Sequence, residues 1–291
     1  MRDIDWQIIS TLHEYKNITK AANLLFIAQP TLTKRIQLIE EELGVTIITR
    51  STKGVSFTAE GAFIALKAQQ ILNTFNDIKL NISQSTNGEI GTLRLGVPNS
   101  YARFVLPSLI AKFTEIYKDI KLEIATALSS EVVNLVENRE VDVGFVRGNF
   151  TTNLEKLEVS DDQIYIVSKS PINLENLPTI PQIEYTKEPT VIKATDIWWK
   201  QHFAKPPNIR MKVNHGDTCL AMIKQNLGYG IFSDKNFFKH DPSLFSLPLI
   251  YKDGTAFTRK TFLVYHKDDL HNTVLNNFVV FIDKYDFLSP E

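Results

Sequence analysis

The stretch between Gly61 and Gly88 contains neither glycine nor proline, and this absence constrains the fold more than any other feature. Both residues disfavour helix interiors, so a long run without them predicts one long helix. That helix separates residues 1–58 from residues 89–291, and 291 residues are enough for two or three domains. We therefore expect a small N-terminal domain, a linker and dimerisation helix with a hinge over residues 59–88, and a larger C-terminal domain.

Apolar residues in the linker helix recur at alternating steps of four and three, as in a heptad seam. Such a helix packs either against its own domain or against a second copy of the chain. We favour a coiled-coil-like dimer contact, because flanking positions such as Lys67, Asn73 and Lys79 are polar. The residues assigned to this contact are Ile64, Ala68, Ile71, Phe75, Ile78 and Ile82.

Residues 29–43 are predicted to form an amphipathic helix, after a first helix from Asp3 and a short one over residues 20–26. Pro30 suits its first turn, and Gly44 suits its end. The apolar side comprises Leu32, Ile36, Ile39 and Leu43. The opposite side carries Gln29, Thr31, Thr33, Lys34 and Gln37. Side chains of this kind suit base edges and phosphates in the major groove, although an ordinary solvated face would have the same periodicity.

A short basic hairpin is predicted to follow. Residues 46–48 and 55–57 are expected to be strands, and the turn between them carries Arg50 and Lys53 and is closed by Gly54. A helix-turn-helix followed by such a hairpin is a winged helix. The wing would place Arg50 and Lys53 against the phosphates or in the minor groove.

The first 61 residues resemble the DNA-binding domain of LysR-type transcriptional regulators. The resemblance is carried by Ala21-Ala22, by the runs QPTLTKRI and LIEEELG over residues 29–36 and 38–44, and by the wing up to Gly61. It implies a sequence-specific regulator of double-stranded DNA, with paired linker helices and a homodimer or homotetramer. The residues assigned to DNA binding are Gln29, Pro30, Thr31, Thr33, Lys34, Arg35, Gln37, Arg50 and Lys53.

Within the DNA-binding domain, the sequence departs from the LysR pattern at two places. Ala28 stands where the family usually has serine, which removes a cap from the following helix. Gln37 and Leu38 replace residues that are often arginine. Fewer cations on this helix predict a weaker salt dependence of DNA binding than is usual.

Strands and helices alternate after Gly91 in two successive units, which predicts an α/β domain of two lobes. The runs GTLRLG, VDVG and LGYGI resemble the periplasmic-binding-protein-like effector domain of the LysR family. We expect residues 89–160 and 267–291 to form the first lobe and residues 161–266 the second. The predicted architecture is thus a mainly α winged helix-turn-helix, a long linker helix and a two-lobed α/β domain.

A small ligand is expected between the lobes, at the carboxyl ends of strands where helices begin. Hydroxyl groups there, with Arg147 as a cation, suit a small anionic metabolite, and we predict no other cofactor. Ser100 and Ser129 lie where the LysR family uses hydroxyls, whereas Ser130 and Thr218 could equally cap their own helices. The residues assigned to the effector are Asn99, Ser100, Tyr101, Ser129, Ser130, Arg147, His215 and Thr218.

Motifs and composition argue against other classes of protein. The chain has no G-x-S-x-G, H-E-x-x-H or P-loop sequence and its six histidines are scattered, so we predict neither a catalytic nor a metal site. A transport binding protein would explain the second half alone, but not the winged helix. The N-terminus lacks a signal-peptide apolar run and no long apolar stretch follows, which favours a cytoplasmic protein without a membrane span.

Charge and cysteine content add two limits. The net charge is −1, and residues 1–60 hold seven basic and seven acidic side chains, so any DNA-facing basic surface must be local. The single cysteine, Cys219, is interpreted as a small buried residue rather than a redox site.

Overall fold

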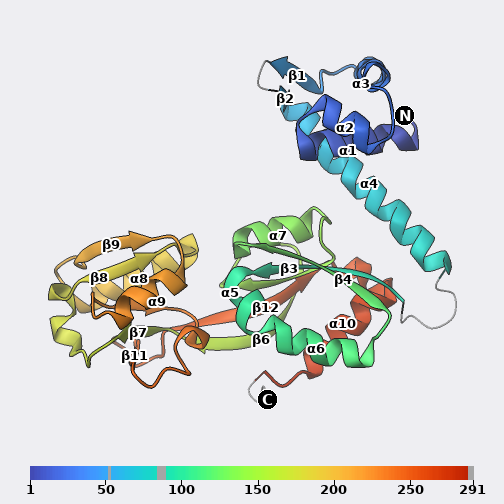
Figure 1. Ribbon diagram of the computed structural model, residues 1–291. Helices are drawn as coiled ribbons and strands as arrows, with labels where there is room; N and C mark the ends of the chain where they lie inside the picture. The colour runs from blue at the N-terminus through green and yellow to red at the C-terminus, as the bar shows by residue number, and fades with distance from the viewer. Residues whose placement is uncertain (52–53, 84–89, 288–291) are drawn as a thin grey trace. The chain divides into compact units, whose positions relative to one another are not determined.

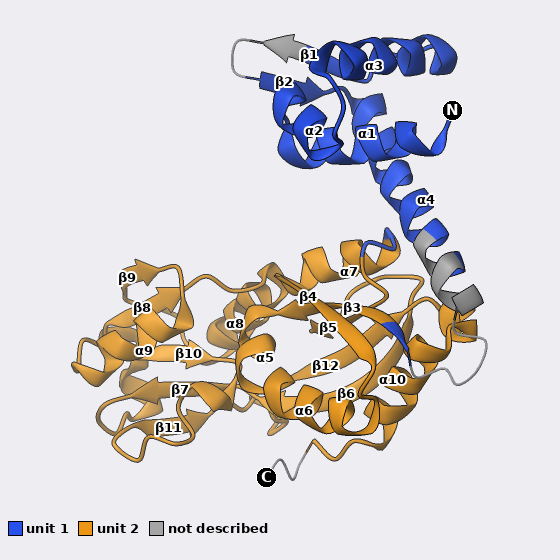
Figure 2. Cartoon of the chain, turned by 45° about the vertical axis from the view of Figure 1, so that its right-hand side comes forward, with its two compact units in different colours: residues 1–91, 138–140 blue, residues 92–137, 141–291 orange. Residues whose placement is uncertain are grey.

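The computed structural model describes residues 1–51, 54–83 and 90–287. The chain divides into two compact units, one of residues 1–91 with 138–140 and one of the remaining residues (Figure 2). Their elements confirm the predicted fold class, which is a winged helix-turn-helix with a long helix, followed by an α/β domain of two lobes (Figure 1).

Three helices build the head of the first unit. They are α1 (Asp3–Tyr15), α2 (Ile18–Leu24) and α3 (Gln29–Leu43). The Asn17 side chain caps α2 by accepting a hydrogen bond from the Lys20 backbone N–H at 2.9 Å. Helix α3 starts at Ala28 without a side-chain cap and ends at Gly44, whose φ of 68° suits glycine. Their shared core includes Ile8, Ile9, Leu12, Ala21, Ala22, Leu32, Ile36 and Ile39.

The wing consists of antiparallel strands β1 (Ile48–Ser51) and β2 (Gly54–Phe57). Glu40 of α3 holds its base, because one carboxylate oxygen accepts the backbone N–H groups of Ile47 and Ile48 at 2.7 and 3.1 Å. Strand β1 begins two residues later than the sequence predicted, because Ile48, opposite Phe57, is the first residue that pairs with β2.

The long helix α4 (Ala59–Ser83) belongs to the first unit and packs along α1. Gly61 permits the start of α4 to approach the backbone before the wing, because a Cβ atom there would lie 2.0 Å from the Ile47 carbonyl oxygen. Ala65 and Ala68 are buried in the core of the unit. The first half of α4 is thus part of the DNA-binding head, and only its second half extends beyond it.

Lobe I is a five-stranded sheet in the order β4-β3-β5-β12-β6 with helices around it (Figure 1). Strands β3 and β5 are parallel, and β12 is antiparallel to both β5 and β6. The strands are β3 (Gly91–Pro98), β4 (Ile120–Ala127), β5 (Val143–Arg147), β6 (Glu155–Gln163) and β12 (Thr258–Tyr265). The helices are α5 (Asn99–Phe104), α6 (Leu106–Ile116), α7 (Ser129–Glu137), η3 (Lys267–His271) and α10 (Thr273–Lys284).

Lobe II has two small sheets, an antiparallel β10-β7-β11 sheet and a parallel β8-β9 pair. Its strands are β7 (Tyr165–Ser168), β8 (Gln182–Tyr185), β9 (Ile209–Val213), β10 (Gly230–Phe232) and β11 (Phe245–Pro248). Its helices are α8 (Pro189–His202), α9 (Gly216–Lys224), η1 (Leu174–Thr179) and η2 (Lys235–Phe237). Trp198 and Trp199 of α8 anchor one core, and Cys219 of α9 is buried in another.

Strands β6 and β12 carry the chain between the lobes, and both belong to the sheet of lobe I. The sequence predicts residues 258–265 as part of lobe II. Because β12 pairs with β6 along its whole length and with β5 from Thr261 onward, the lobe boundary falls near residues 163 and 258 instead. A break at Val105 separates α5 from α6, two residues before Pro107.

Candidate functional sites

The polar side of α3 is exposed, as expected of a surface that meets another molecule. Its exposed members are Gln29, Pro30, Thr31, Lys34 and Gln37. Thr33 differs from the expectation, because its hydroxyl is buried and has no hydrogen-bond partner among the described residues. The side of α3 that can contact DNA is therefore narrower than the periodicity indicated.

Arg35 is bound within its own unit. Its guanidinium makes two hydrogen bonds to the Asp5 carboxylate of α1, with N···O distances of 2.5 and 2.7 Å. The Asp5 side chain is fully buried. Burial raises the pKa of Asp5, but the Arg35 guanidinium and the Arg2 backbone N–H outweigh it and hold the pKa below its usual range. Arg35 thus neutralises a buried acid and fixes α3 against α1, which differs from its predicted role as a DNA contact.

The wing residues can be placed only in part. Arg50 lies in β1 opposite Val55, on a hairpin whose strands are only four residues each. The Arg50 side chain and all of Lys53 fall outside the described residues. Their assignment to DNA contacts remains a prediction.

The residues of the predicted seam on α4 have two different environments. Ala68 is buried against the head and Ile64 packs on the same core. Farther along, Phe75 and Ile78 are 48% and 49% exposed. Ile71 is half-buried between these regions, and the Ile82 side chain lies outside the described residues. Only the second half of the seam is therefore available to another chain.

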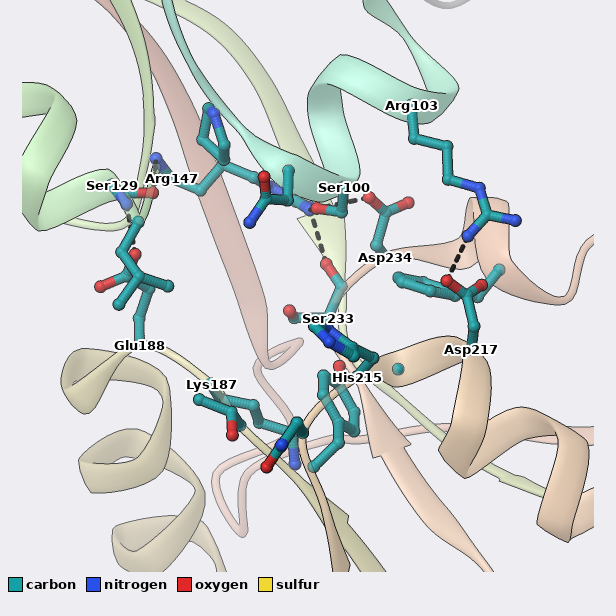
Figure 3. Close-up of a pocket in the computed structure, with 18 of the residues that line it drawn as sticks. Ser100, Arg103, Ser129, Arg147, Lys187, Glu188, His215, Asp217, Ser233 and Asp234 are labelled. Atoms are coloured by element: carbon teal, nitrogen blue, oxygen red, sulfur yellow. Dashed lines mark hydrogen bonds and ion pairs between the residues drawn. The ribbon is translucent and has the colours of Figure 1, made fainter. Parts of the chain in front are cut away.

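A cleft of about 570 Å³ separates the lobes and is lined by both (Figure 3). Five residues assigned from the sequence line it, namely Asn99, Ser100, Ser129, Arg147 and His215. Three others do not. Tyr101 is buried and stacks on Phe145 at 4.6 Å, Ser130 does not line the cleft although its hydroxyl donates to Glu188, and Thr218 is exposed on α9. The expected ring of hydroxyls is thus reduced to Ser100 and Ser129.

Arg147 stands at the centre of a charge network across the cleft. Only 2% of its side chain is exposed. Its guanidinium contacts Asp234 at 2.9 Å, Asp162 at 3.2 Å and the Ser233 carbonyl oxygen at 2.6 Å. Because two carboxylates already balance this cation, Arg147 joins the lobes and has little charge left for a ligand.

Glu188, at the start of α8 in lobe II, occupies the N-terminus of α7 in lobe I (Figure 3). Its carboxylate accepts the Ser129 backbone N–H and, at 3.3 Å, the Ser130 hydroxyl. The Ser129 hydroxyl meanwhile accepts the Arg147 backbone N–H at 3.1 Å. A helix N-terminus favours an anion, and here the protein supplies that anion itself.

Two further cations line the cleft from the lobe II side and the crossing strand. Lys187 lies 4.6 Å from the centre of the Tyr185 ring, and burial lowers the pKa of its ammonium to about 8. Arg259 of β12 donates to the Arg147 carbonyl oxygen at 2.8 Å and to the Ser233 hydroxyl at 3.3 Å. Burial, and then the Arg147 charge, lower the pKa of Arg259 below the usual range of a guanidinium.

Sequence reasoning missed Lys187, Glu188, Asp234 and Arg259, and two of these had a usable signal. Lys187 and Glu188 follow strand β8 directly, at the kind of strand end where ligand sites gather. Strand β8 escaped detection because Gln182 and Ile183 are both buried, so it has no alternation of apolar and polar residues. Asp234 likewise follows β10, but nothing local indicated its partner Arg147.

A winged helix-turn-helix joined to a two-lobed α/β domain with a polar cleft defines a ligand-sensing class of DNA-binding regulator. Residues 5–62 match the bacterial regulatory helix-turn-helix protein family of lysR type, and residues 86–285 match the LysR substrate binding domain. The chain therefore belongs to the LysR family of DNA-binding transcriptional regulators.

Individual relatives agree with this assignment. The chain is 32% identical to the uncharacterized HTH-type transcriptional regulator YraN of Bacillus subtilis, over 97% of each sequence. It is 30% identical to YkuM of the same organism, another uncharacterized HTH-type transcriptional regulator, over 88% of each. Full-length CbnR, solved in complex with its target DNA, shares the fold with a TM-score of 0.72 at 18% identity, over 97% of this chain and 99% of CbnR.

The matched domains and named relatives are those of transcriptional regulators, so the chain is a regulator and not an enzyme. Among the described residues, no helix combines the length and the apolar character needed to cross a membrane.

Proposed function

We propose that the chain is a sequence-specific transcriptional regulator that binds DNA through α3 and the wing and responds to a small anion in the cleft. The main support for the DNA contact is the exposed row of hydrogen-bonding side chains on α3, opposite a buried apolar stripe. Gln29, Thr31 and Gln37 have the donors and acceptors that read base edges, and Lys34 can contact a phosphate. CbnR supports this role, because it was solved with its target DNA.

Lys34 provides a direct test of the contact. We expect Lys34→Ala to weaken binding to all duplexes by a similar factor and to reduce the slope of log affinity against log salt by about 0.9 per lost phosphate contact. Lys112→Ala is the matched control, because Lys112 is an exposed lysine of α6 in the second unit. Fluorescence anisotropy at several salt concentrations measures both. An unchanged slope in Lys34→Ala would contradict the placement of α3 on DNA.

The functional form is a homodimer or homotetramer in which the second half of α4 pairs with a second chain. Phe75 and Ile78 support this proposal, since about half of each large apolar side chain is exposed on a helix that extends past its own head. Two heads on one assembly would engage two half-sites, which one chain cannot do.

Ile78→Asp tests this contact by placing a charge in an apolar interface, which is costly unless the charge is paired. We expect dissociation to single chains at micromolar concentration and loss of tight operator binding, measured by light scattering and anisotropy. Val280→Asp is the control, because Val280 is also an exposed apolar residue and lies on α10 of the second unit. A wild-type mass for the Ile78→Asp protein would exclude α4 as the contact.

The effector is a small anionic metabolite bound between the lobes. The volume of the cleft falls within the range of small-ligand sites, which is roughly 300–1,000 Å³. Ser100 and Asn99 of lobe I face His215 and Lys187 of lobe II across it. A ligand that contacts both lobes favours one arrangement of them, and such a difference in affinity is what a response in DNA binding requires.

A further inference from the structure

The cations of the cleft fall into two groups. Arg103 is paired with Asp217, and Arg147 is paired with Asp162 and Asp234. Lys187 and Arg259 line the same cleft, yet among the described residues neither has a carboxylate within ion-pair distance. The protein therefore balances two of its four cleft cations and leaves two available.

Both unpaired cations lie where a positive charge is poorly solvated. Burial lowers the pKa of Lys187, although Cys219 and Glu184 act in the opposite direction, and Glu184 is itself paired with Lys212 at 2.9 Å. Burial and Arg147 lower the pKa of Arg259, and the more distant Glu188 and Asp234 compensate only in part. An oxyanion beside these two side chains would replace the solvation that they have lost.

The opposite wall of the cleft is closed to such an anion. Glu188 fills the N-terminus of α7, and the Ser129 hydroxyl is engaged by the backbone of Arg147. Ser100 keeps only a 3.5 Å contact to Arg147, so lobe I offers weak, uncharged hydrogen-bonding capacity. A ligand carboxylate at α7 would have to displace a resident one.

Tyr185 lies close to both of the cations that lack an ion pair. Its ring lies under the Lys187 ammonium, and its hydroxyl is within electrostatic range of Arg259. All three residues line the cleft. The lysine, the arginine and the tyrosine hydroxyl can all donate hydrogen bonds, and none of the three is a carboxylate. Such a set of donors suits a single oxyanion.

We propose that the acidic end of the effector is bound by Lys187 and Arg259, and not by the N-terminus of α7, with its uncharged end toward Asn99 and Ser100. This inference rests on the proposed function and specifies its ligand as a small oxyanion, such as a monocarboxylate. Lys187 is then the residue that selects for charge.

The test uses the full-length protein with acetate, sulfate and phosphate as probes, each compared with sodium chloride at equal ionic strength. Calorimetry and thermal unfolding at pH 7 report binding, since a ligand of the folded state alone raises the melting temperature. We expect Lys187→Met to weaken the best probe at least about tenfold, or about 1.4 kcal/mol. Lys187→Arg should retain most of the affinity. Lys193→Met, an exposed lysine of α8 outside the cleft lining, should match the wild type.

The three probes also separate a carboxylate site from a sulfate or phosphate site by their order of affinity. Equal binding to wild type and Lys187→Met would overturn the inference, as would the absence of any anion effect. Glu188→Gln adds an independent check, because it removes the resident carboxylate from α7. Anion binding that appears only in the Glu188→Gln protein, and that is unaffected when Lys187→Met is added, would place the site in lobe I.

Binding of the wild-type chain to duplex DNA is measured alongside without added probe. Protein that binds DNA but no anion contradicts this inference and leaves the DNA-binding proposal standing. Protein that binds the anion but no DNA contradicts the DNA-binding proposal alone.

Discussion

Arg35 in the first unit and Arg147 in the second both form ion pairs with carboxylates of the protein, but they differ in burial and in what they hold together. Each was assigned to a ligand from its place in the sequence, and each is instead held by carboxylates of the protein. Arg35 is 24% exposed and joins two neighbouring helices through Asp5, whereas Arg147 is 2% exposed, pairs with Asp162 of its own lobe and joins the two lobes through Asp234. The comparison indicates that an arginine at a position typical of ligand contacts can instead fix the architecture through carboxylates of the protein.

Removing Arg147 should have the larger effect. Arg147→Met leaves Asp162 and Asp234 without their cation, and breaking a buried pair in this way costs about 3–5 kcal/mol. Lys260→Met is the control, because Lys260 pairs with Glu158 at 2.8 Å on the exposed side of the same lobe and should cost less than about 1 kcal/mol. Urea unfolding measures the loss of unfolding free energy in each variant. Similar losses in both would show that Arg147 contributes no more to stability than an exposed ion pair does.

Removing Arg35 should cost less, about 2 kcal/mol, because the guanidinium is partly exposed and only one carboxylate loses its partner. The effect should depend on pH. The pKa of Asp5 is lowered in the folded chain, so its contribution is complete above the unfolded pKa of about 4 and is lost as the pH falls through the folded value. The difference in unfolding free energy between wild type and Arg35→Met should therefore shrink below about pH 4.

A double-mutant cycle sharpens this second prediction. In an Asp5→Asn background the loss caused by Arg35→Met should fall to a fraction of its wild-type size, since the buried charge is gone. If the two losses simply add, the Arg35–Asp5 pair is not what fixes α3 against α1.

The two units also differ in how far the sequence predicted them. Helix α3, its apolar stripe and its end at Gly44 follow from local periodicity, so the exposed polar side of α3 could be predicted, whereas the burial of the Thr33 hydroxyl and the pairing of Arg35 with Asp5 could not. The cleft depends on partners that are distant in the chain. The contact between Glu188 and Ser129 spans 59 residues and that between Arg147 and Asp234 spans 87, and no local pattern records either.

Recognition of base sequence by α3 is the central proposal for this protein. Site selection from random duplex DNA tests it directly. Wild-type full-length protein should enrich two related half-sites, as a paired regulator requires. Gln29 lies at the start of α3, so Gln29→Ala should keep the half-site spacing and lose preference at one position of each half-site, at a cost of about 1–3 kcal/mol per lost base contact. Gln201→Ala, on an exposed position of α8, should select the wild-type sequence. Enrichment of no sequence by the wild type, or the same consensus and affinity for Gln29→Ala, would contradict the account.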